Sequence, residues 1–255
     1  ATCVTAMATD LFQSKYALAA GSLTLIAVSI FRWTRRVQGA RKQEKSHGVL
    51  PCIRSRRSIF PRDYVHATVD PKIVTTLLEA AIWAPFHGPR APWRFVVLGR
   101  DAMVQMQKIT LSFYDQNWQH TGWASGEHGS ESEYLKWRAM TEEEITGRWG
   151  PVSYMIAIIM QRQAHPQKRM PEWEEAAATA CAVQNMHIQA TEFPGLACYW
   201  SSWHDAARDS SEMHHFLGMA SEDKCMGFFI VAACREGLKD RRRRCVEEFA
   251  IEWRE

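Results

Sequence analysis

The sequence lacks the short motifs that identify the common nucleotide-binding and hydrolytic enzymes. It contains no GxGxxG, GxxxxGK[ST], HExxH or GxSxG. Its seven cysteines are scattered, include no CxxC pair, and several stand in apolar, core-like segments. These absences argue against a classical dinucleotide site, a P-loop, a zincin and an α/β-hydrolase. The cysteines predict reduced, structural thiols and no zinc site.

An excess of charge of one sign is also missing. The formal net charge is +3 over 255 residues, which is too small to indicate a nucleic-acid partner. Residues 241–244 are four consecutive arginines that could hold a phosphate, although such a run is more often a solvated tail. Apolar residues make up 46% of the chain, enough for the core of one large domain with a short appendage.

One long hydrophobic run stands near the N-terminus. Residues 16–31 are uncharged, with Lys15 before them and Arg32, Arg35 and Arg36 after them. Counted to residue 33, the run is just long enough to span a thin bilayer. We expect a single-pass membrane anchor (about 16–33) within residues 1–38, a polar linker at 39–48 and a globular domain at 49–255. A signal peptide or targeting sequence is the alternative.

The chain starts at Ala1 rather than Met. We take this as a sign of processing. Together with the single anchor and the absence of a disulfide pattern, it favours a mitochondrial or chloroplast membrane.

The rest of the chain alternates helical and strand patterns. Asp70 and Pro71 are typical of a helix N-terminus. Near-continuous apolar runs predict buried strands. The predicted helices are 50–56, 101–118, 133–145, 174–193, 211–217 and one starting at 71; the predicted strands are 93–98, 151–160, 196–202 and 224–233. A loop at 86–91, with His87 and nearby arginines, is a candidate site for an anionic cofactor, or an ordinary connection. His187, alone on an apolar helix, predicts a satisfied core histidine.

Several segments resemble one known family when they are taken in order. They are the run RRSIF at 56–60, AP then His then PWRF across 84–95, ACAVQNMH at 180–187, GLACYWSS at 195–202 and DKCMGFF at 223–229. In this order and spacing they resemble the nitroreductase family of FMN-dependent oxidoreductases. The resemblance covers roughly residues 50–255.

The resemblance implies an α+β fold with a mixed, mostly antiparallel sheet flanked by helices. It also implies a homodimer with FMN bound across the subunit interface, and NAD(P)H as the electron donor to an electrophilic acceptor. No side chain needs to act as an acid or base, because the flavin carries the hydride. The positions that match the family's cofactor contacts are Arg56, Arg57, Ser58, Trp83, His87, Trp200, Ser201, Ser202 and, in the tail, Arg243.

The chain departs from the family pattern at two places. Trp203 stands where a glycine commonly follows the ring-side strand, so its indole could stack on the flavin, cover it or fill the substrate site. Residues 232–234 read Ala-Ala-Cys where a Gly-x-Pro is common. A second hypothesis is therefore a catalytically degenerate accessory subunit of an organellar membrane complex. Iodotyrosine deiodinases also join an anchor to this fold, but their substrate-binding lid residues are not identifiable here.

Overall fold

The computed structural model describes residues 48–123, 129–237 and 254. The chain divides into two units, Ala1–Val49 and Leu50–Glu255, and the second is described below. The predicted membrane segment at 16–33 and the tail position Arg243 lie outside the described residues, as does the predicted linker apart from Gly48. Within the described ranges, no helix is both long and apolar enough to cross a membrane.

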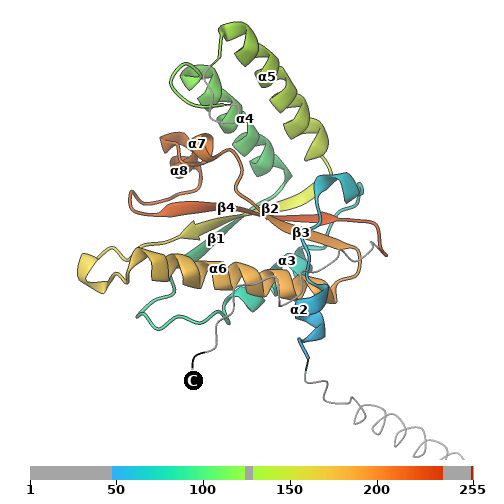
Figure 1. The fold of residues 1–255 in the computed structure, drawn as a ribbon, viewed down its shortest axis with the longest axis vertical. Coiled ribbons are helices and arrows are strands. Elements are labelled where there is room, and N and C mark those ends of the chain that lie inside the picture. The colour runs from blue at the N-terminus through green and yellow to red at the C-terminus, as the bar shows by residue number, and fades with distance from the viewer. Residues whose placement is uncertain (1–47, 124–128, 238–253, 255) are drawn as a thin grey trace, which may run out of the picture. The chain divides into compact units, whose positions relative to one another are not determined.

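The described part of the domain is built on a four-stranded sheet in the order β1-β2-β4-β3. The strands are β1 (Trp93–Leu98), β2 (Val152–Met160), β3 (Leu196–Ser201) and β4 (Lys224–Ala233). All three pairings are antiparallel, which agrees with the prediction of a mostly antiparallel sheet. The central strands β2 and β4 are almost wholly buried because helices cover both faces of the sheet (Figure 1).

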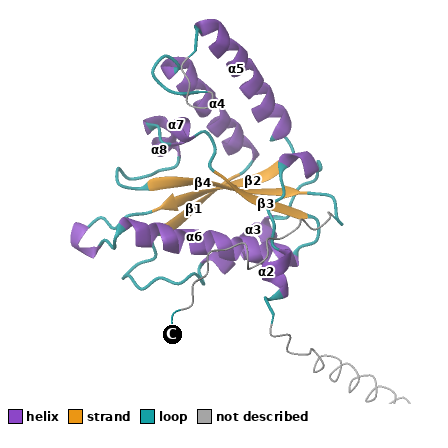
Figure 2. Ribbon diagram, in the orientation of Figure 1, coloured by secondary structure: helices purple, strands orange, loops and turns teal. Residues whose placement is uncertain are grey.

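One face of the sheet is covered by α3 (Pro71–Ala81) and α6 (Glu172–Gln189), and the other by α4 (Arg100–Asn117), α7 (Asp205–Arg208) and α8 (Ser211–Phe216) (Figure 2). Each face has its own buried cluster, so the sheet separates two cores. The remaining helical segments are α2 (Pro51–Ser55), η1 (Pro61–Asp63), α5 (Glu131–Glu143), the π-helical turn η2 (Glu144–Arg148), η3 (Pro166–Lys168) and η4 (Ala190–Glu192).

Local capping explains where two of the helices begin. The Asp70 carboxylate accepts a hydrogen bond from Lys72 N at 2.8 Å, and Pro71 occupies the first helical position of α3, as predicted. At the start of α5, Ser130 N donates to Glu133 Oε2 at 2.8 Å in a capping box. Both caps satisfy backbone donors that the first helical turn leaves without a partner.

The helical hairpin of α4 and α5 is joined by an aromatic residue. Tyr134 on α5 is buried, with only 3% of its surface exposed. Its hydroxyl donates to Asp115 Oδ1 at 2.7 Å, and its ring stacks on Trp118 at a centroid distance of 5.1 Å within the aromatic cluster between the two helices. Tyr134 therefore joins α5 to α4. Residues 124–128, between the two helices in the sequence, lie outside the described ranges.

Candidate functional site

The predicted phosphate-binding segment, residues 56–58, follows α2 and lies against the edge strand β3. Ile59 N donates to Cys198 O at 3.2 Å, and the Tyr64 hydroxyl donates to Ile59 O at 3.0 Å. These bonds fix the backbone immediately after Ser58. Arg56, Arg57 and Ser58 are all half-buried, so the segment stands at the boundary between core and solvent. Two guanidinium groups and a hydroxyl at such a boundary suit a phosphate, because the arginine fork matches its oxygens.

His187, near the C-terminal end of α6, contacts this segment through both nitrogens of its imidazole ring. Its Nε2 lies 2.9 Å from Arg57 O and 3.1 Å from Cys198 O, and its Nδ1 lies 3.4 Å from Arg56 Nη1. Burial, and secondly the Arg56 charge, lower the pKa of His187 from 6.5 to about 4. The imidazole is therefore neutral at physiological pH.

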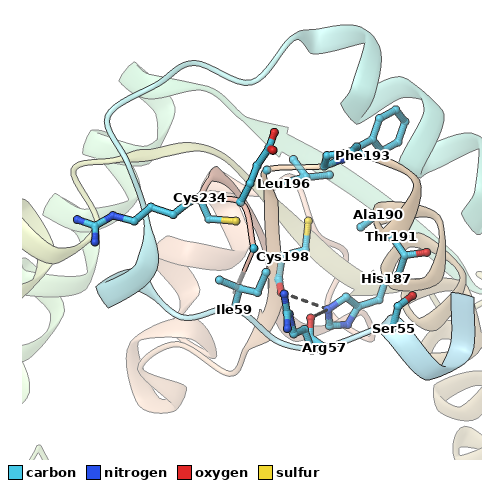
Figure 3. Close-up of a pocket in the computed structure, with 15 residues that line it drawn as sticks. Ser55, Arg57, Ile59, His187, Ala190, Thr191, Phe193, Leu196, Cys198 and Cys234 are labelled. Atoms are coloured by element: carbon cyan, nitrogen blue, oxygen red, sulfur yellow. Dashed lines mark hydrogen bonds between the residues drawn. The ribbon is translucent and has the colours of Figure 1, made fainter. Parts of the chain in front are cut away.

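A cavity of about 280 Å³ opens beside these residues (Figure 3). It lies between the segment after α2, the end of α6, the start of β3 and the chain that follows β4. Its polar and charged lining comes from Ser55, Arg57, His187, Thr191, Arg235 and Glu236. Gly195, also in the lining, has a φ of 75°, which a glycine adopts without strain as the chain turns into β3.

Two thiols line the same cavity, Cys198 and Cys234. Burial raises the pKa of both thiols above their ordinary value. Neither is therefore a thiolate nucleophile near neutral pH. Among the residues that the structure describes, no group of His, Cys, Asp and Glu side chains could hold a metal ion. The charged lining of the cavity consists of two guanidinium groups and one carboxylate, an excess of one cation that suits an anion.

His87 lies at the other end of α6. Its Nδ1 lies 3.0 Å from Glu174 Oε1 in the first turn of that helix, while Trp83, just after α3, is 83% exposed. Glu174 and His187 are thirteen residues apart in sequence number on one helix, which corresponds to about 20 Å. His87 and the phosphate-binding segment therefore cannot reach the same part of one small molecule within a single subunit.

The ring-side segment occupies the far end of β3 from the cavity. Trp200 Nε1 donates to Met226 O at 2.7 Å, and Ser202 O accepts from Arg208 Nη1 at 3.0 Å. Gly227 on the neighbouring strand has a φ of 106°, and a Cβ there would stand 2.2 Å from Ser201 O. Only a glycine fits so close to Ser201, and this holds the segment tightly on β4.

Trp203 follows this segment, and its backbone lies in the left-handed region of conformational space with a φ of 60°. This conformation explains why a residue without a Cβ suits the position. The indole is directed into the core, where Nε1 donates to Thr110 Oγ1 at 2.9 Å. Its ring makes edge contacts with Trp149 and Phe228. The side chain therefore packs between the sheet and α4.

The chain also matches a known protein family. A model of the nitroreductase family matches residues 53–233, well over half of the chain. The chain belongs to the nitroreductase family. This confirms the family, and the nitroreductase-like α+β fold, that the sequence motifs predicted.

Individual relatives of the nitroreductase family are distant. The Bacillus subtilis (strain 168) protein YfhC, whose name gives NAD(P)H nitroreductase as a provisional activity, is 25% identical over 187 residues, covering 72% of this chain and 83% of YfhC. A nitroreductase from Bacteroides fragilis solved with bound FMN has a TM-score of 0.57 at 20% identity, covering 81% of this chain and all of that one. NfnB from Mycobacterium smegmatis, solved with NADPH, has a TM-score of 0.55 at 13% identity, covering 80% and 96%. These structural likenesses concern the fold.

Within this nitroreductase domain, one arginine near the 86–91 loop has a structural role, and two predicted site residues have partners that the sequence did not reveal. Arg94, one of the cations near the 86–91 loop, donates to Leu217 O and Gly218 O at 3.0 and 2.9 Å, so it ties β1 to the end of α8. His87 pairs with Glu174, and Arg56 pairs with His187. The sequence alone predicted neither pairing. Both pairings join residues far apart in sequence, and helical periodicity does not report them.

Proposed function

We propose that this chain is an FMN-dependent oxidoreductase that passes hydride from NAD(P)H to an electrophilic acceptor in a ping-pong sequence. Family membership supports the class of reaction. One observation carries the proposal further. Residues 56–58 stand beside a cavity whose charged lining is Arg57, Arg235 and Glu236, and the ring-side residues lie at the far end of β3, the strand that borders this cavity. A cofactor with an anionic end and a planar ring fits this arrangement.

The residues present fit a flavin mononucleotide. Arg57 and Arg235 line the cavity, and Arg56 lies next to it on His187. From Cys198, which lines the cavity, to Ser201 at the end of β3 the strand rises about 10 Å. A ribityl chain spans such a distance, so a phosphate held near Arg57 leaves the ring near the end of β3. When bound, FMN supplies the atom that accepts and donates the hydride.

The chain's own residues then have binding and orienting roles. The two arginines neutralise the phosphate, and Ser58 offers a hydroxyl to the phosphate or the ribityl chain. Trp200 and Ser201 form a rigid wall, because Met226 and Gly227 on β4 hold them in place. No acid–base pair is required of the protein, because the flavin carries the hydride.

A homodimer completes this site. The cavity of about 280 Å³ lies just below the range of about 300–1,000 Å³ usual for small-molecule sites, so one subunit offers little room for a whole flavin nucleotide. His87 lies about 20 Å from the phosphate-binding segment in the same subunit, because it pairs with Glu174 at the start of α6. If the α6 helices of two subunits pack antiparallel, the start of one helix lies beside the end of the other. His87 of one subunit then meets the phosphate-binding segment of its partner.

The experiment is the visible spectrum of purified protein, followed by extraction and identification of any flavin. We expect a flavin spectrum that NAD(P)H bleaches and that an added electrophilic acceptor restores. Bound FMN that neither NADH nor NADPH bleaches would favour the degenerate accessory subunit instead. A protein that binds no flavin, even with FMN added, would refute the enzyme.

Attachment to a membrane through residues 16–33, in a mitochondrion or chloroplast, is a separate proposal that the hydrophobic run motivates. Membership of a larger membrane complex goes with it. Alkaline carbonate extraction of membranes from cells that express the full chain tests attachment. Release of the protein into the soluble fraction would contradict the anchor without affecting the proposed reaction.

A further inference from the structure

His187 is a buried titratable residue to which the proposed reaction gives no part. It is 7% exposed and stands on α6 among apolar neighbours, with its ring edge-on to Phe229. Both of its ring nitrogens are engaged, and both face the phosphate-binding segment or the strand beneath it. A histidine that only filled the core would not need this arrangement, because an aliphatic side chain fills such a position at lower cost.

The partners fix the tautomer of the imidazole. Arg57 O and Cys198 O can only accept hydrogen bonds, so the Nε2 that lies between them carries the proton. The Arg56 guanidinium can only donate, so Nδ1 must be the acceptor. A proton on Nδ1 would turn this attraction into a repulsion between two cations, and the lowered pKa of His187 agrees with the neutral form.

We propose that His187 is a positioning residue, which orients the Arg56 guanidinium and the Arg57 backbone for the phosphate of the cofactor. This inference rests on the proposed function, because it takes the phosphate to be that of a bound flavin nucleotide. His187 does not touch the phosphate in this scheme. It acts through Arg56, because Nδ1 accepts from one guanidinium donor, and through the Arg57 carbonyl, to which Nε2 donates.

The position of the bonds makes the role specific. Cys198 O also accepts from Ile59 N, so one carbonyl of β3 receives both the backbone after the segment and the imidazole. His187 thus locks the side chain of one arginine and the backbone of the next to the same point of the sheet. A guanidinium oriented in advance loses less conformational entropy when it binds a phosphate.

The test compares FMN with riboflavin, which has the same ring and ribityl chain but no phosphate. Both are titrated into flavin-free full-length protein, and the ratio of the two dissociation constants is taken for each variant. In His187→Leu we expect the preference for FMN to fall by about tenfold or more, the scale of one hydrogen bond to a charged group. His187→Gln, with one donor and one acceptor, should recover part of the preference.

Two further variants separate positioning from a general loss of structure. Gln189→Leu makes the same polar-to-leucine change two residues later on α6 and should leave the ratio unchanged. In an Arg56→Gln background, His187→Leu should have little further effect on the ratio, because the guanidinium that it orients is gone. If His187→Leu does not fold, the cycle is made with His187→Gln.

The outcomes distinguish this inference from the proposed function. A wild-type protein that prefers FMN, with a ratio that His187 variants leave unchanged, would overturn the positioning role and leave the enzyme intact. Equal weakening of FMN and riboflavin would also overturn it, since a structural role weakens both. A wild-type protein that binds neither flavin would refute the proposed function, and the inference with it.

Discussion

Trp203 combines an unfavourable backbone conformation with a favourable side-chain position. A non-glycine residue in the left-handed region costs about 1–2 kcal/mol. Against this, the indole packs on Trp149 and Phe228 and donates to Thr110 Oγ1. Removing a packed tryptophan costs about 3–5 kcal/mol, so the packing outweighs the strain. This balance explains how a bulky residue is kept at a position that suits glycine.

We therefore expect Trp203→Gly to destabilise the domain by about 2 kcal/mol, because the lost packing exceeds the relieved strain. The measurement is the free energy of unfolding in urea. Trp203→Phe keeps a ring but loses the hydrogen bond, and should lie between wild type and the glycine variant. A glycine variant at least as stable as wild type would mean that the backbone strain outweighs the packing. That result would favour the hypothesis that the indole fills the substrate site.

His187 also makes stability depend on pH. Its pKa is about 4 in the folded protein against 6.5 ordinarily, so the unfolded chain binds the proton first as pH falls. Stability is therefore fully present above pH 6.5 and is lost as pH falls towards 4. From about pH 7.5 to about pH 5 we expect a loss of about 2 kcal/mol from this group.

Urea unfolding at these two pH values checks the prediction, with His187→Gln as the comparison. The variant has no imidazole to titrate, so its loss over the same interval should be smaller by about 2 kcal/mol. His204, whose pKa burial also lowers, adds a loss of the same sign in both proteins and cancels in the difference. Identical losses in the two proteins would contradict the lowered pKa.

At the scale of elements, Asp115 joins α4 to α5. It accepts from the Tyr134 hydroxyl, and from Arg138 Nε and Nη2 at 2.8 and 3.1 Å. Burial acts to raise the pKa of Asp115, but the hydrogen bonds from Arg138 and Tyr134 outweigh it and hold the pKa below its ordinary value. The carboxylate is therefore charged at neutral pH and anchors both donors.

Asp115→Ala should loosen α5 selectively, since it leaves the buried Tyr134 hydroxyl without its acceptor. We expect a local loss of about 1–3 kcal/mol. Hydrogen exchange should show faster exchange of α5 amides with little change in α6. Glu142→Gln, which removes only the exposed pair with Arg138 on the same helix, should change exchange by less than about 0.5 kcal/mol. Uniformly faster exchange would contradict a local role.

The elements that sequence reasoning placed well are those with a strong local cause. The apolar runs of β2 and β4 follow from burial on both faces, and Asp70 with Pro71 marks a helix start without any tertiary information. The sequence pattern of α5 does not show that Tyr134 is buried, because its hydroxyl is satisfied by Asp115 on another helix. Where a segment is polar and its hydrophobic residues follow no regular period, the sequence does not predict which side chains pack against another helix.

The same distinction applies to the candidate site. The run 56–58 was visible because its chemistry is local: adjacent guanidinium groups and a hydroxyl. The pairing of Arg56 with His187 spans 131 positions, and that of His87 with Glu174 is also a tertiary contact. Pattern alone made His187 a satisfied core histidine, which it is. The partners that satisfy it, and thus its connection to the site, required the fold.

At the scale of the whole molecule, α6 offers a face suited to a second subunit. Trp173, Ala177, Cys181 and Gln184 are exposed along it, with no charged side chain among these four. Trp173 alone is 72% exposed. Cys181 stands next to the midpoint of α6, so antiparallel packing of two such helices would bring the two Cys181 thiols near each other. A short bis-maleimide should then link two chains, and Cys181→Ser should prevent the link.

Ala177→Arg tests whether this face also completes the flavin site. A charged side chain in the middle of an apolar contact should give a monomer by light scattering, because its desolvation has no compensating partner. If the contacts at Trp83 and His87 come from the partner, FMN should be lost with the dimer, by at least about tenfold in affinity. Glu143→Arg, on the exposed surface of α5, introduces the same side chain and should change neither property. A monomer that keeps FMN at full affinity would show that one subunit holds the cofactor by itself. The separation between His87 and the phosphate-binding segment would then not reflect a site shared by two subunits.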